Sequence, residues 1–410
     1  MKPYFPSISA INSASLLIGG LFHPTPLIKH VALSAKYDAN IFLKREDLTP
    51  VRSYKIRGAY NRMSHLKNRN PIVTCSAGNH AQGVAFACNK LNIMGNIFMP
   101  KITTKQKIDK VKQLGNSNVK IFLEGNDFDE SFQIAKQYSG EHTNEFIHPF
   151  DDEKVIEGQG TVGLEIIQQL HGLHPDYVFL PIGGGGLAAG VSSYMNYVSP
   201  KTKIIGVQPV GAPSMFESFK KEYIVELQTI NSFVDGAAVK KPGNLNFTIC
   251  RKYLDDIRLV DEGHICSKIV QMYNDDGLII EPAGVLSLCA LDNTIADIKG
   301  KNVVCVVSGG NSDVFRMPEI LERSLIYEGV KHYFKVYFPQ KAGALKDFML
   351  KVIGPQNDII YFKYTKIINK ETGPAIIGIQ TVNKEDIKTI LRNMESYGIH
   401  YEKLTNVSDI

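Results

Sequence analysis

The feature that most constrains the fold of this chain is a repeated order of short apolar segment, turn and helical segment. Apolar segments typical of strands lie at 72–75, 96–99, 119–123, 177–182, 203–208 and 302–307. Helical segments at 81–90, 103–114 and 127–138 alternate with them, and Gly115 is predicted to cap the second helix at its C-terminus. This alternation predicts an α/β fold with mostly parallel sheets.

Three turns rich in serine, glycine and asparagine directly follow three of these strands, at 76–80, 183–187 and 308–311. The carboxyl ends of parallel strands meet at one edge of a sheet, and ligands of open α/β sheets bind outside that edge. The sequence therefore predicts that the three turns share one ligand site.

The pattern changes near residue 325. Four strands are predicted at 332–338, 359–367, 375–381 and 400–404, a turn at 369–373, and two helices at 345–352 and 387–394. The order βαββαβ predicts a ferredoxin-like module. Because this part carries no nucleophile and no glycine-rich cradle, we expect a catalytic region at 1–325, with a smaller subdomain at about 51–150, and a separate domain without chemistry at 326–410.

Lys55 stands at the start of a predicted helix, between Tyr54 and Ile56. Apolar neighbours withdraw water from a lysine and lower the pKa of its amine, and a neutral amine can attack a carbonyl carbon to form a Schiff base. The alternative is a solvated surface lysine, which is the more common state of this residue. The other motifs of the chain help to decide whether Lys55 is a catalytic or a surface lysine.

Four consecutive glycines, Gly183 to Gly186, follow a strand and open a predicted helix. A backbone without side chains can approach an anion closely, and the N–H groups of the helix N-terminus can bind it, as they would a phosphate. One alternative is a tight turn. Another is a dinucleotide site, because residues 183–188 match G-x-G-x-x-A. That fold requires an acidic residue at the end of the next strand, which here ends at Gln208.

Polar groups in the other two turns are suited to a carboxylate and to a ring. The turn from Ser76 to His80 offers a hydroxyl, an amide and N–H groups; the alternatives are an N-cap serine and a helix histidine with a satisfied ring. Ser308 is suited either to a ring nitrogen or to a helix cap, and Glu281 is either a buried acid or an ordinary loop glutamate. A desolvated lysine, a phosphate cradle and polar groups for a ring together predict pyridoxal phosphate as the cofactor.

The composition argues against several other classes of protein. Of 410 residues, 44% are hydrophobic and 21% charged, which is typical of a globular chain with two or three domains. The net charge of +5, from 46 basic and 41 acidic residues, is too small to indicate a nucleic-acid partner. The six cysteines form no C-x-x-C pair, which predicts buried free thiols in a reducing cytoplasm and leaves any metal unassigned. We expect neither a membrane span nor a signal peptide.

Several ordered motifs resemble those of threonine dehydratases (threonine deaminases), which are fold-type-II, tryptophan synthase β-like pyridoxal-phosphate enzymes. These motifs are Lys44 to Leu48, Ser53 to Asn61, Ser76 to Gly83, Gly183 to Leu187, Glu281 to Gly284 and Ser308 to Asn311. The resemblance spans roughly 25–311, and residues 325–410 resemble an ACT-like regulatory domain. It implies two open parallel-sheet subdomains followed by that domain. With room for one such module, the chain resembles the short biosynthetic form more than the degradative form, which has none.

The resemblance also implies a role for each residue of the predicted site. Lys55 would carry the cofactor and take the α-proton from the substrate, Asn79 would hydrogen-bond the phenolic oxygen of the cofactor, and Ser308 its pyridine nitrogen. The phosphate would be held by Gly183, Gly184, Gly185, Gly186 and Leu187. The substrate carboxylate would be held by Ser76, Ala77, Gly78, Asn79 and His80.

The activity implied by the resemblance is that of a lyase that converts L-threonine to 2-oxobutanoate and ammonia, the committed step towards isoleucine. We expect a cytoplasmic homo-oligomer, a dimer or tetramer, with isoleucine as its allosteric inhibitor. The alternatives are a serine dehydratase or racemase of the same fold, acting on L-serine, and a non-catalytic amino-acid-binding protein. Lys55 argues against the last. Ala77 argues against a racemase, because serine racemases carry serine at the matching position and a methyl group cannot move a proton.

Overall fold

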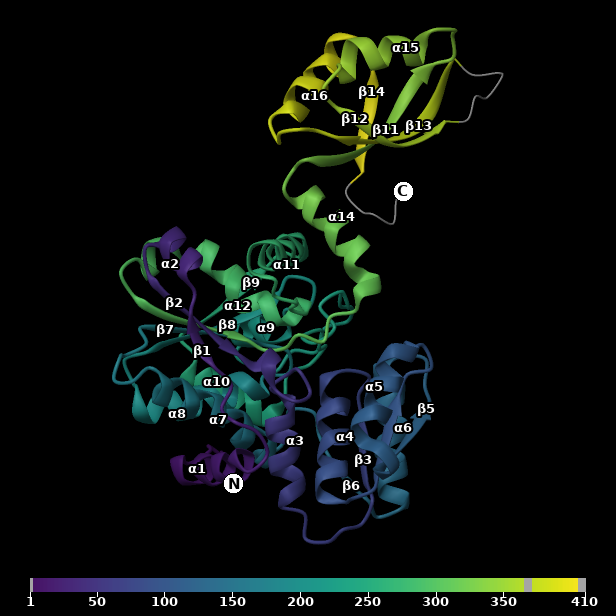
Figure 1. The fold of residues 1–410 in the computed structure, drawn as a ribbon. Helices are drawn as coiled ribbons and strands as arrows, with labels where there is room; N and C mark the ends of the chain where they lie inside the picture. The colour runs from purple at the N-terminus through teal and green to yellow at the C-terminus, as the bar shows by residue number, and fades with distance from the viewer. Residues whose placement is uncertain (1–2, 365–370, 405–410) are drawn as a thin grey trace. The chain divides into compact units, whose positions relative to one another are not determined.

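The computed structural model describes residues 3–364 and 371–404 of the chain. Contacts between residues divide it into two compact units, Met1–Asp313 and Val314–Ile410, and Figure 1 labels most of their helices and strands. Within the described residues, no helix is long and apolar enough to cross a membrane. All six cysteines are free and buried, as the sequence predicts. The domain boundary at 325 and the smaller subdomain at about 51–150 stay predictions.

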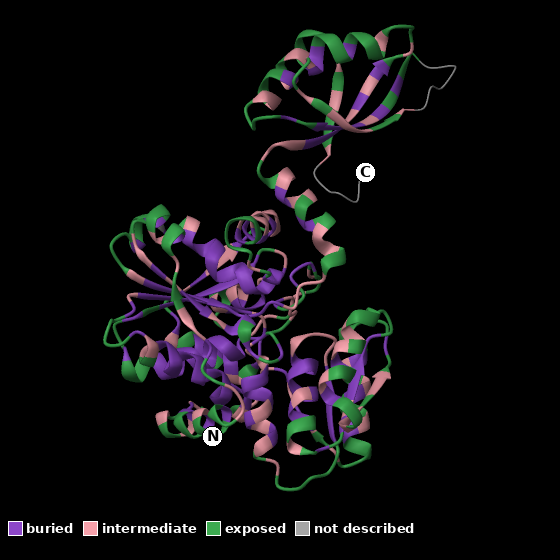
Figure 2. Ribbon diagram, viewed as in Figure 1, coloured by how far each residue is buried: buried purple, intermediate pink, exposed green. Residues whose placement is uncertain are grey.

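A six-stranded sheet forms the larger part of the first unit. Its strands in sheet order are β1 (Leu27–Lys29), β2 (Asn40–Arg45), β10 (Asn302–Val307), β7 (Tyr177–Pro181), β8 (Lys203–Pro209) and β9 (Asp256–Val260). β1 pairs antiparallel with β2, and the other pairs are parallel. The three central strands are almost wholly buried, as expected where helices cover both faces of a parallel sheet (Figure 2).

A second sheet in the first unit has four parallel strands. Their sheet order is β5 (Val119–Leu123), β4 (Gly95–Met99), β3 (Ile72–Cys75) and β6 (Glu145–Phe146). The helices along this part of the chain are α4 (Asn79–Leu91), α5 (Lys105–Gly115) and α6 (Phe128–Glu141). Strands β3, β5 and β10 have the predicted bounds, and the two sheets, one parallel and one mostly parallel, confirm the predicted α/β class.

The remaining helices of the first unit pack mainly around the larger sheet. They are α1 (Ile8–Gly19), α2 (Val31–Tyr37), α3 (Lys55–Ser64), α7 (Glu153–Gln169), α8 (Gly186–Val198), α9 (Ser214–Lys221), α10 (Asn244–Tyr253), α11 (Glu262–Asp276), α12 (Leu286–Cys289) and α13 (Ile295–Ile298). Helix α7 is buried over most of its length, since its residues 155–166 are all buried.

Helix α7 packs closely against both α3 and α8. A Cβ added to Gly158 of α7 would lie 2.6 Å from the carbonyl oxygen of Arg57 in α3. A Cβ added to Gly190 of α8 would lie 2.5 Å from the backbone nitrogen of Gly160 in α7. No real side chain approaches a backbone atom this closely, so glycine at these crossing points brings the three helices together.

The predicted cap at Gly115 is wrong. Gly115 is the last residue of α5, with φ of −86°, and the C-cap is Asn116, with φ of +52° and ψ of −132°. Helix α5 therefore ends one residue later than predicted. Gly115 is needed for a different reason, because a Cβ there would lie only 3.0 Å from the Cβ of Val119.

The second unit begins with a helix and continues as a four-stranded antiparallel sheet with helices. Its elements are α14 (Met317–Tyr327), β11 (Lys331–Pro339), α15 (Ala344–Phe348) with a π-helical turn (Met349–Ile353), β12 (Asp358–Tyr364), β13 (Thr372–Gln380), α16 (Asp386–Ser396) and β14 (His400–Leu404). The sheet order β12-β13-β11-β14 is that of the predicted ferredoxin-like βαββαβ module. Residues 365–370, which hold the end of one predicted strand and the start of the predicted turn, lie outside the described residues.

We expect Gly190→Ala to destabilise the protein, because the new methyl group would collide with the backbone of α7. Overpacking of this kind costs about 1–3 kcal/mol, which urea denaturation followed by circular dichroism would detect. Gly140→Ala in α6 is the control: a Cβ there meets no atom within 4 Å, and alanine favours a helix by about 0.5–1 kcal/mol. Equal denaturation midpoints for the two variants would contradict the close approach of α7 and α8.

Candidate active site

Lys55 is the first residue of α3. Its Nζ donates a hydrogen bond to the carbonyl oxygen of Pro149 at 2.8 Å, and it lies 5.9 Å from the ring centroid of Phe150. Burial lowers the pKa of the amine to about 8, although the charge of Glu281 acts in the opposite direction. More of this amine is therefore neutral near pH 7–8 than of a solvated lysine, and a neutral amine is the nucleophilic form.

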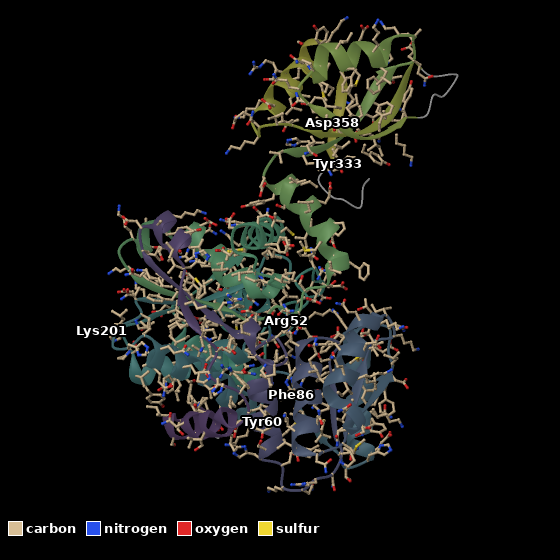
Figure 3. All side chains as sticks on the ribbon, in the orientation of Figure 1. Arg52, Tyr60, Phe86, Lys201, Tyr333 and Asp358 are labelled. Atoms are coloured by element: carbon tan, nitrogen blue, oxygen red, sulfur yellow. The ribbon has the colours of Figure 1, made fainter. Side chains whose placement is uncertain are left out.

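The segment before Lys55 is hydrogen-bonded to the turn after β10. The Tyr54 N–H donates to the carbonyl oxygen of Ser308 at 3.1 Å. The Gly310 N–H donates to the carbonyl oxygen of Arg52 at 2.9 Å. Arg52 is labelled in Figure 3. These two bonds bring the carboxyl end of β10 to the start of α3.

Ser308 is buried, and its hydroxyl donates to the carbonyl oxygen of Ala283 at 3.3 Å, which is long for a hydroxyl hydrogen bond. A hydroxyl has one proton and can rotate, so Ser308 can exchange this long bond for one in which it donates to an unprotonated ring nitrogen beside it. A neutral hydroxyl would hold a ring nitrogen without the negative charge that keeps such a nitrogen protonated.

The four glycines form the turn between β7 and α8. Gly185 precedes the helix with φ of +97°, a left-handed conformation that favours glycine. A Cβ added to Gly184 would lie 2.5 Å from ring atoms of Phe150. The first N–H groups of a helix have no partner within it, so the start of α8 is suited to bind a phosphate. Leu187 in the first turn of α8 is buried.

Phe150 contacts both Lys55 and the glycine turn, and the sequence assigned it no role. Its ring faces the Lys55 amine, and its carbonyl oxygen would lie 3.1 Å from a Cβ added to Gly186. The one local signal for it is the short strand β6, whose carboxyl end lies four residues earlier. Phe150 therefore brings a fourth strand end into the site.

The turn from Ser76 to His80 connects β3 to α4. The Ser76 hydroxyl accepts a hydrogen bond from the Gly78 N–H at 3.1 Å, and Asn79 is the first residue of α4. A Cβ added to Gly78 would meet no atom within 4 Å, so open space adjoins this turn, and Ala77 beside it is half-buried. The N–H groups at the start of α4 favour a carboxylate in that space.

The ring of His80 is already used within the protein. It is buried, and its Nε2 lies 3.2 Å from the carbonyl oxygen of Ile147. Burial, and to a lesser degree the charge of Lys55, lowers its pKa to about 3, so the ring is neutral and donates this bond. His80 can therefore contribute its backbone N–H, at the start of α4, to the binding of a carboxylate.

Asn79 and Glu281 are hydrogen-bonded to each other. The Nδ2 of Asn79 donates to Oε1 of Glu281 at 2.6 Å, and its Oδ1 accepts from Nδ2 of Asn311 at 2.7 Å. Glu281 is 5% exposed, and burial, with a smaller effect of the charge of Asp235, raises its pKa to about 7. Of the two alternatives that the sequence leaves open for Glu281, the structure supports the buried acid.

The structure thus brings the three strand-end turns and the start of α3 into one site. Among the described residues, no group of three or more His, Cys, Asp or Glu side chains could hold a metal ion. The groups present fit pyridoxal phosphate: a desolvated amine suits its aldehyde, a glycine turn with a helix N-terminus suits its phosphate, and Asn79 and Ser308 suit the polar atoms of its ring. Together with the two mostly parallel sheets, they define the class of fold-type-II pyridoxal-phosphate enzymes.

Comparison with known proteins supports this class and narrows it. Residues 18–309 match the family of pyridoxal-phosphate dependent enzymes, and residues 322–409 match the C-terminal regulatory domain of threonine dehydratase. A biosynthetic L-threonine dehydratase of Halalkalibacterium halodurans is 51% identical over 383 residues, which cover 93% of this chain and 92% of the relative. One of Bacillus subtilis is 49% identical over 418 residues, which cover 100% of this chain and 99% of the relative.

Solved structures of related enzymes share the fold of most of this chain. The processed form of threonine deaminase isoform 2 from Solanum lycopersicum is 37% identical, with a TM-score of 0.72 over 79% of this chain and 96% of its own. Maize serine racemase is 28% identical, with a TM-score of 0.71 over 79% of this chain and 99% of its own. This chain belongs to the family of biosynthetic L-threonine dehydratases. The predicted family, fold class and cofactor are confirmed.

The pKa of about 8 predicts that the Lys55 amine of the cofactor-free protein reacts early with a small amine-directed reagent, such as formaldehyde with cyanoborohydride. Its reactivity should rise as the pH rises through about 8, because the neutral fraction passes one half there. The labelled peptides can be quantified by mass spectrometry between about pH 7 and pH 10. Lys201, an exposed lysine labelled in Figure 3, is the comparison. Equal labelling of both lysines at every pH would contradict the lowered pKa.

Proposed function

We propose that this chain converts L-threonine to 2-oxobutanoate and ammonia, the committed step towards isoleucine. The observation that carries the proposal is the desolvated amine of Lys55. Phe150 contacts both this amine and the glycine turn, so the two lie close together. The names of the two bacterial relatives support threonine as the substrate. When bound, pyridoxal phosphate supplies the electron sink that stabilises negative charge at the α-carbon of an amino acid.

We assign the steps at the protein side to a few residues. Lys55 holds the cofactor through its amine and later receives the proton of the substrate α-carbon; an amine with a pKa near the working pH is suited to that transfer. The turn from Gly183 to Leu187 holds the phosphate. Asn79 donates to the phenolic oxygen of the cofactor, and Ser308 pairs with its ring nitrogen.

The turn from Ser76 to His80 holds the substrate carboxylate at the start of α4. Within this turn, Ala77 packs against the apolar cluster that includes Ala81 and Ile97. Racemisation requires a second acid or base on the face of the α-carbon opposite Lys55, and a methyl group cannot serve. This favours elimination over the racemase alternative.

The proposal is tested by incubating the purified protein with L-threonine and L-serine. We expect 2-oxobutanoate from threonine and a visible absorption band from bound cofactor. Lys55→Ala should show no such absorption band, because the attachment point of the cofactor is gone. Its turnover rate should fall by about 10²–10⁴-fold or more, because the base is removed as well. Turnover of Lys55→Ala at the wild-type rate would remove Lys55 from the mechanism. D-serine formed from L-serine as fast as pyruvate would favour the racemase alternative.

We further propose that isoleucine inhibits the enzyme by binding to the second unit. A cavity of about 310 Å³ lies there between the β11–α15 connection and β12. Its lining includes the apolar side chains of Phe338, Leu345 and Phe362, and the positively charged Lys341. Gln340 also lines it, and its Nε2 is buried without a hydrogen-bond partner among the described residues. An apolar wall beside donors suits an apolar amino acid with its carboxylate.

Inhibition requires that isoleucine bind one state of the enzyme better than the other. A typical coupling free energy of about 1–3 kcal/mol would change substrate affinity several-fold or more. We propose a homo-oligomer, a dimer or tetramer, because modules of this kind pair their sheets between subunits. The six free buried cysteines support a reducing, cytoplasmic location.

Leu345→Arg should abolish inhibition by isoleucine, because a longer charged side chain would occupy the cavity. Leu350→Arg is the matched control: Leu350 lies in the same helical segment, is 67% exposed and does not line the cavity. Threonine saturation curves with and without millimolar isoleucine provide the measurement, and both variants should keep the uninhibited rate. Equal inhibition of Leu345→Arg and wild type would place the effector elsewhere.

A further inference from the structure

Glu281 has no role in the function proposed above, although it is a buried titratable residue at the site. The surrounding backbone leaves room for its carboxylate, since a Cβ added to Gly309 would overlap with its Oε1. The Glu281 N–H donates to the carbonyl oxygen of Gly309 at 3.2 Å, and the backbone of Asn311 donates to the carboxylate. The carboxylate is therefore held in one place by the turn after β10.

The orientation of the Asn311 side-chain amide is fixed by a hydrogen bond to the backbone of Val51. Its Nδ2 donates to the carbonyl oxygen of Val51 at 2.9 Å, and a carbonyl oxygen can only accept. The same Nδ2 donates to Oδ1 of Asn79 at 2.7 Å. Asn311 therefore dictates that the oxygen end of the Asn79 amide points towards it.

The nitrogen end of the Asn79 amide consequently points towards Glu281. Nδ2 carries two hydrogens, and the bond to Glu281 at 2.6 Å uses one of them. With Glu281 ionised, a flipped amide would place its oxygen against the carboxylate and its NH₂ against that of Asn311, which replaces two hydrogen bonds with two repulsive contacts. The repulsion between the two NH₂ groups does not depend on the protonation of Glu281, whose pKa is about 7. The second hydrogen of Nδ2 remains for a ligand.

We propose that Glu281 and Asn311 are positioning residues that lock the Asn79 amide with an N–H, rather than an oxygen, directed at the phenolic oxygen of the cofactor. The inference rests on the role proposed above for Asn79. An unlocked amide could present its oxygen to that atom, where two acceptors would repel each other. Because Val51 lies four residues before Lys55, the same chain of bonds ties the orientation of the Asn79 donor to the segment that carries the amine.

The test measures cofactor binding rather than turnover. Cofactor-free protein is titrated with pyridoxal phosphate, and the dissociation constant and the visible spectrum are recorded. Glu281→Leu removes the acceptor for Nδ2, and Asn311→Asp replaces the donor to Oδ1 with an acceptor of the same shape. Each variant should weaken cofactor binding about tenfold, which corresponds to about 1.4 kcal/mol, and change the ratio of the absorption bands. Glu281→Gln keeps an acceptor oxygen and should restore most of the affinity lost in Glu281→Leu.

A double-mutant cycle with Asn79→Ala separates positioning from general destabilisation. If Glu281 acts through Asn79, Glu281→Leu should lose no further affinity in the Asn79→Ala background. Glu262→Gln is the control: its Oε1 accepts from the Gly211 N–H at 2.8 Å, and the change should leave the spectrum and the dissociation constant as in wild type. Should Asn311→Asp not fold, the Glu281 variants and the cycle still decide.

Two results would overturn the inference: a wild-type spectrum and dissociation constant in Glu281→Leu, or full additivity of Glu281→Leu with Asn79→Ala. Failure of the proposed function has a different signature. If the cycle behaves as expected but wild-type protein releases no 2-oxobutanoate from L-threonine, the substrate assignment fails and the role of Glu281 and Asn311 stands.

Discussion

The buried guanidinium of Arg57 is the constraint on which the rest of the catalytic unit depends. It is 0% exposed and donates to Glu46 at 2.7 Å and to Glu165 at 2.6 Å. Burial opposes its charge, but the two glutamates outweigh burial and hold the pKa of Arg57 above its usual range. Breaking a buried ion pair of this kind costs about 3–5 kcal/mol, because one charge is left without a partner. The network therefore ties α3 to the turn after β2 and to α7.

The position of Lys55 follows from this network, because Lys55 precedes Arg57 by two residues on the same helix. Glycines complete the arrangement: Gly158 lets α7 approach α3, and a Cβ added to Gly83 of α4 would lie 3.1 Å from the carbonyl carbon of Lys55. With α3 held by α4 and α7, the amine is directed at Pro149 and stays desolvated. The reactive group is thus placed by buried structure.

Strands such as β3 and β10 and the turns that follow them are predictable because their signals are local: short apolar runs that end in glycine, serine and asparagine. Helix α7 is not predicted, because Gly158, Gly160 and Gly163 lower its intrinsic helix propensity and its stability comes from close packing. Phe150 is missed for a related reason. Its local signal is weak, because the strand β6 before it has only two residues, and its importance arises from contact with Lys55 and the glycine turn.

The α/β class, the ferredoxin-like module and the turns of the site can be predicted from the sequence, since each depends on residues that are neighbours along the chain. The cofactor can be predicted as well, because several such local motifs occur together in one chain. Only the tertiary structure decides how those groups behave. Asn79 meets Glu281 and Asn311 more than 200 residues away, and these partners fix which end of its amide faces the site. Burial by distant segments likewise lowers the pKa of Lys55 and raises that of Glu281, because desolvation is set by everything that surrounds a charge.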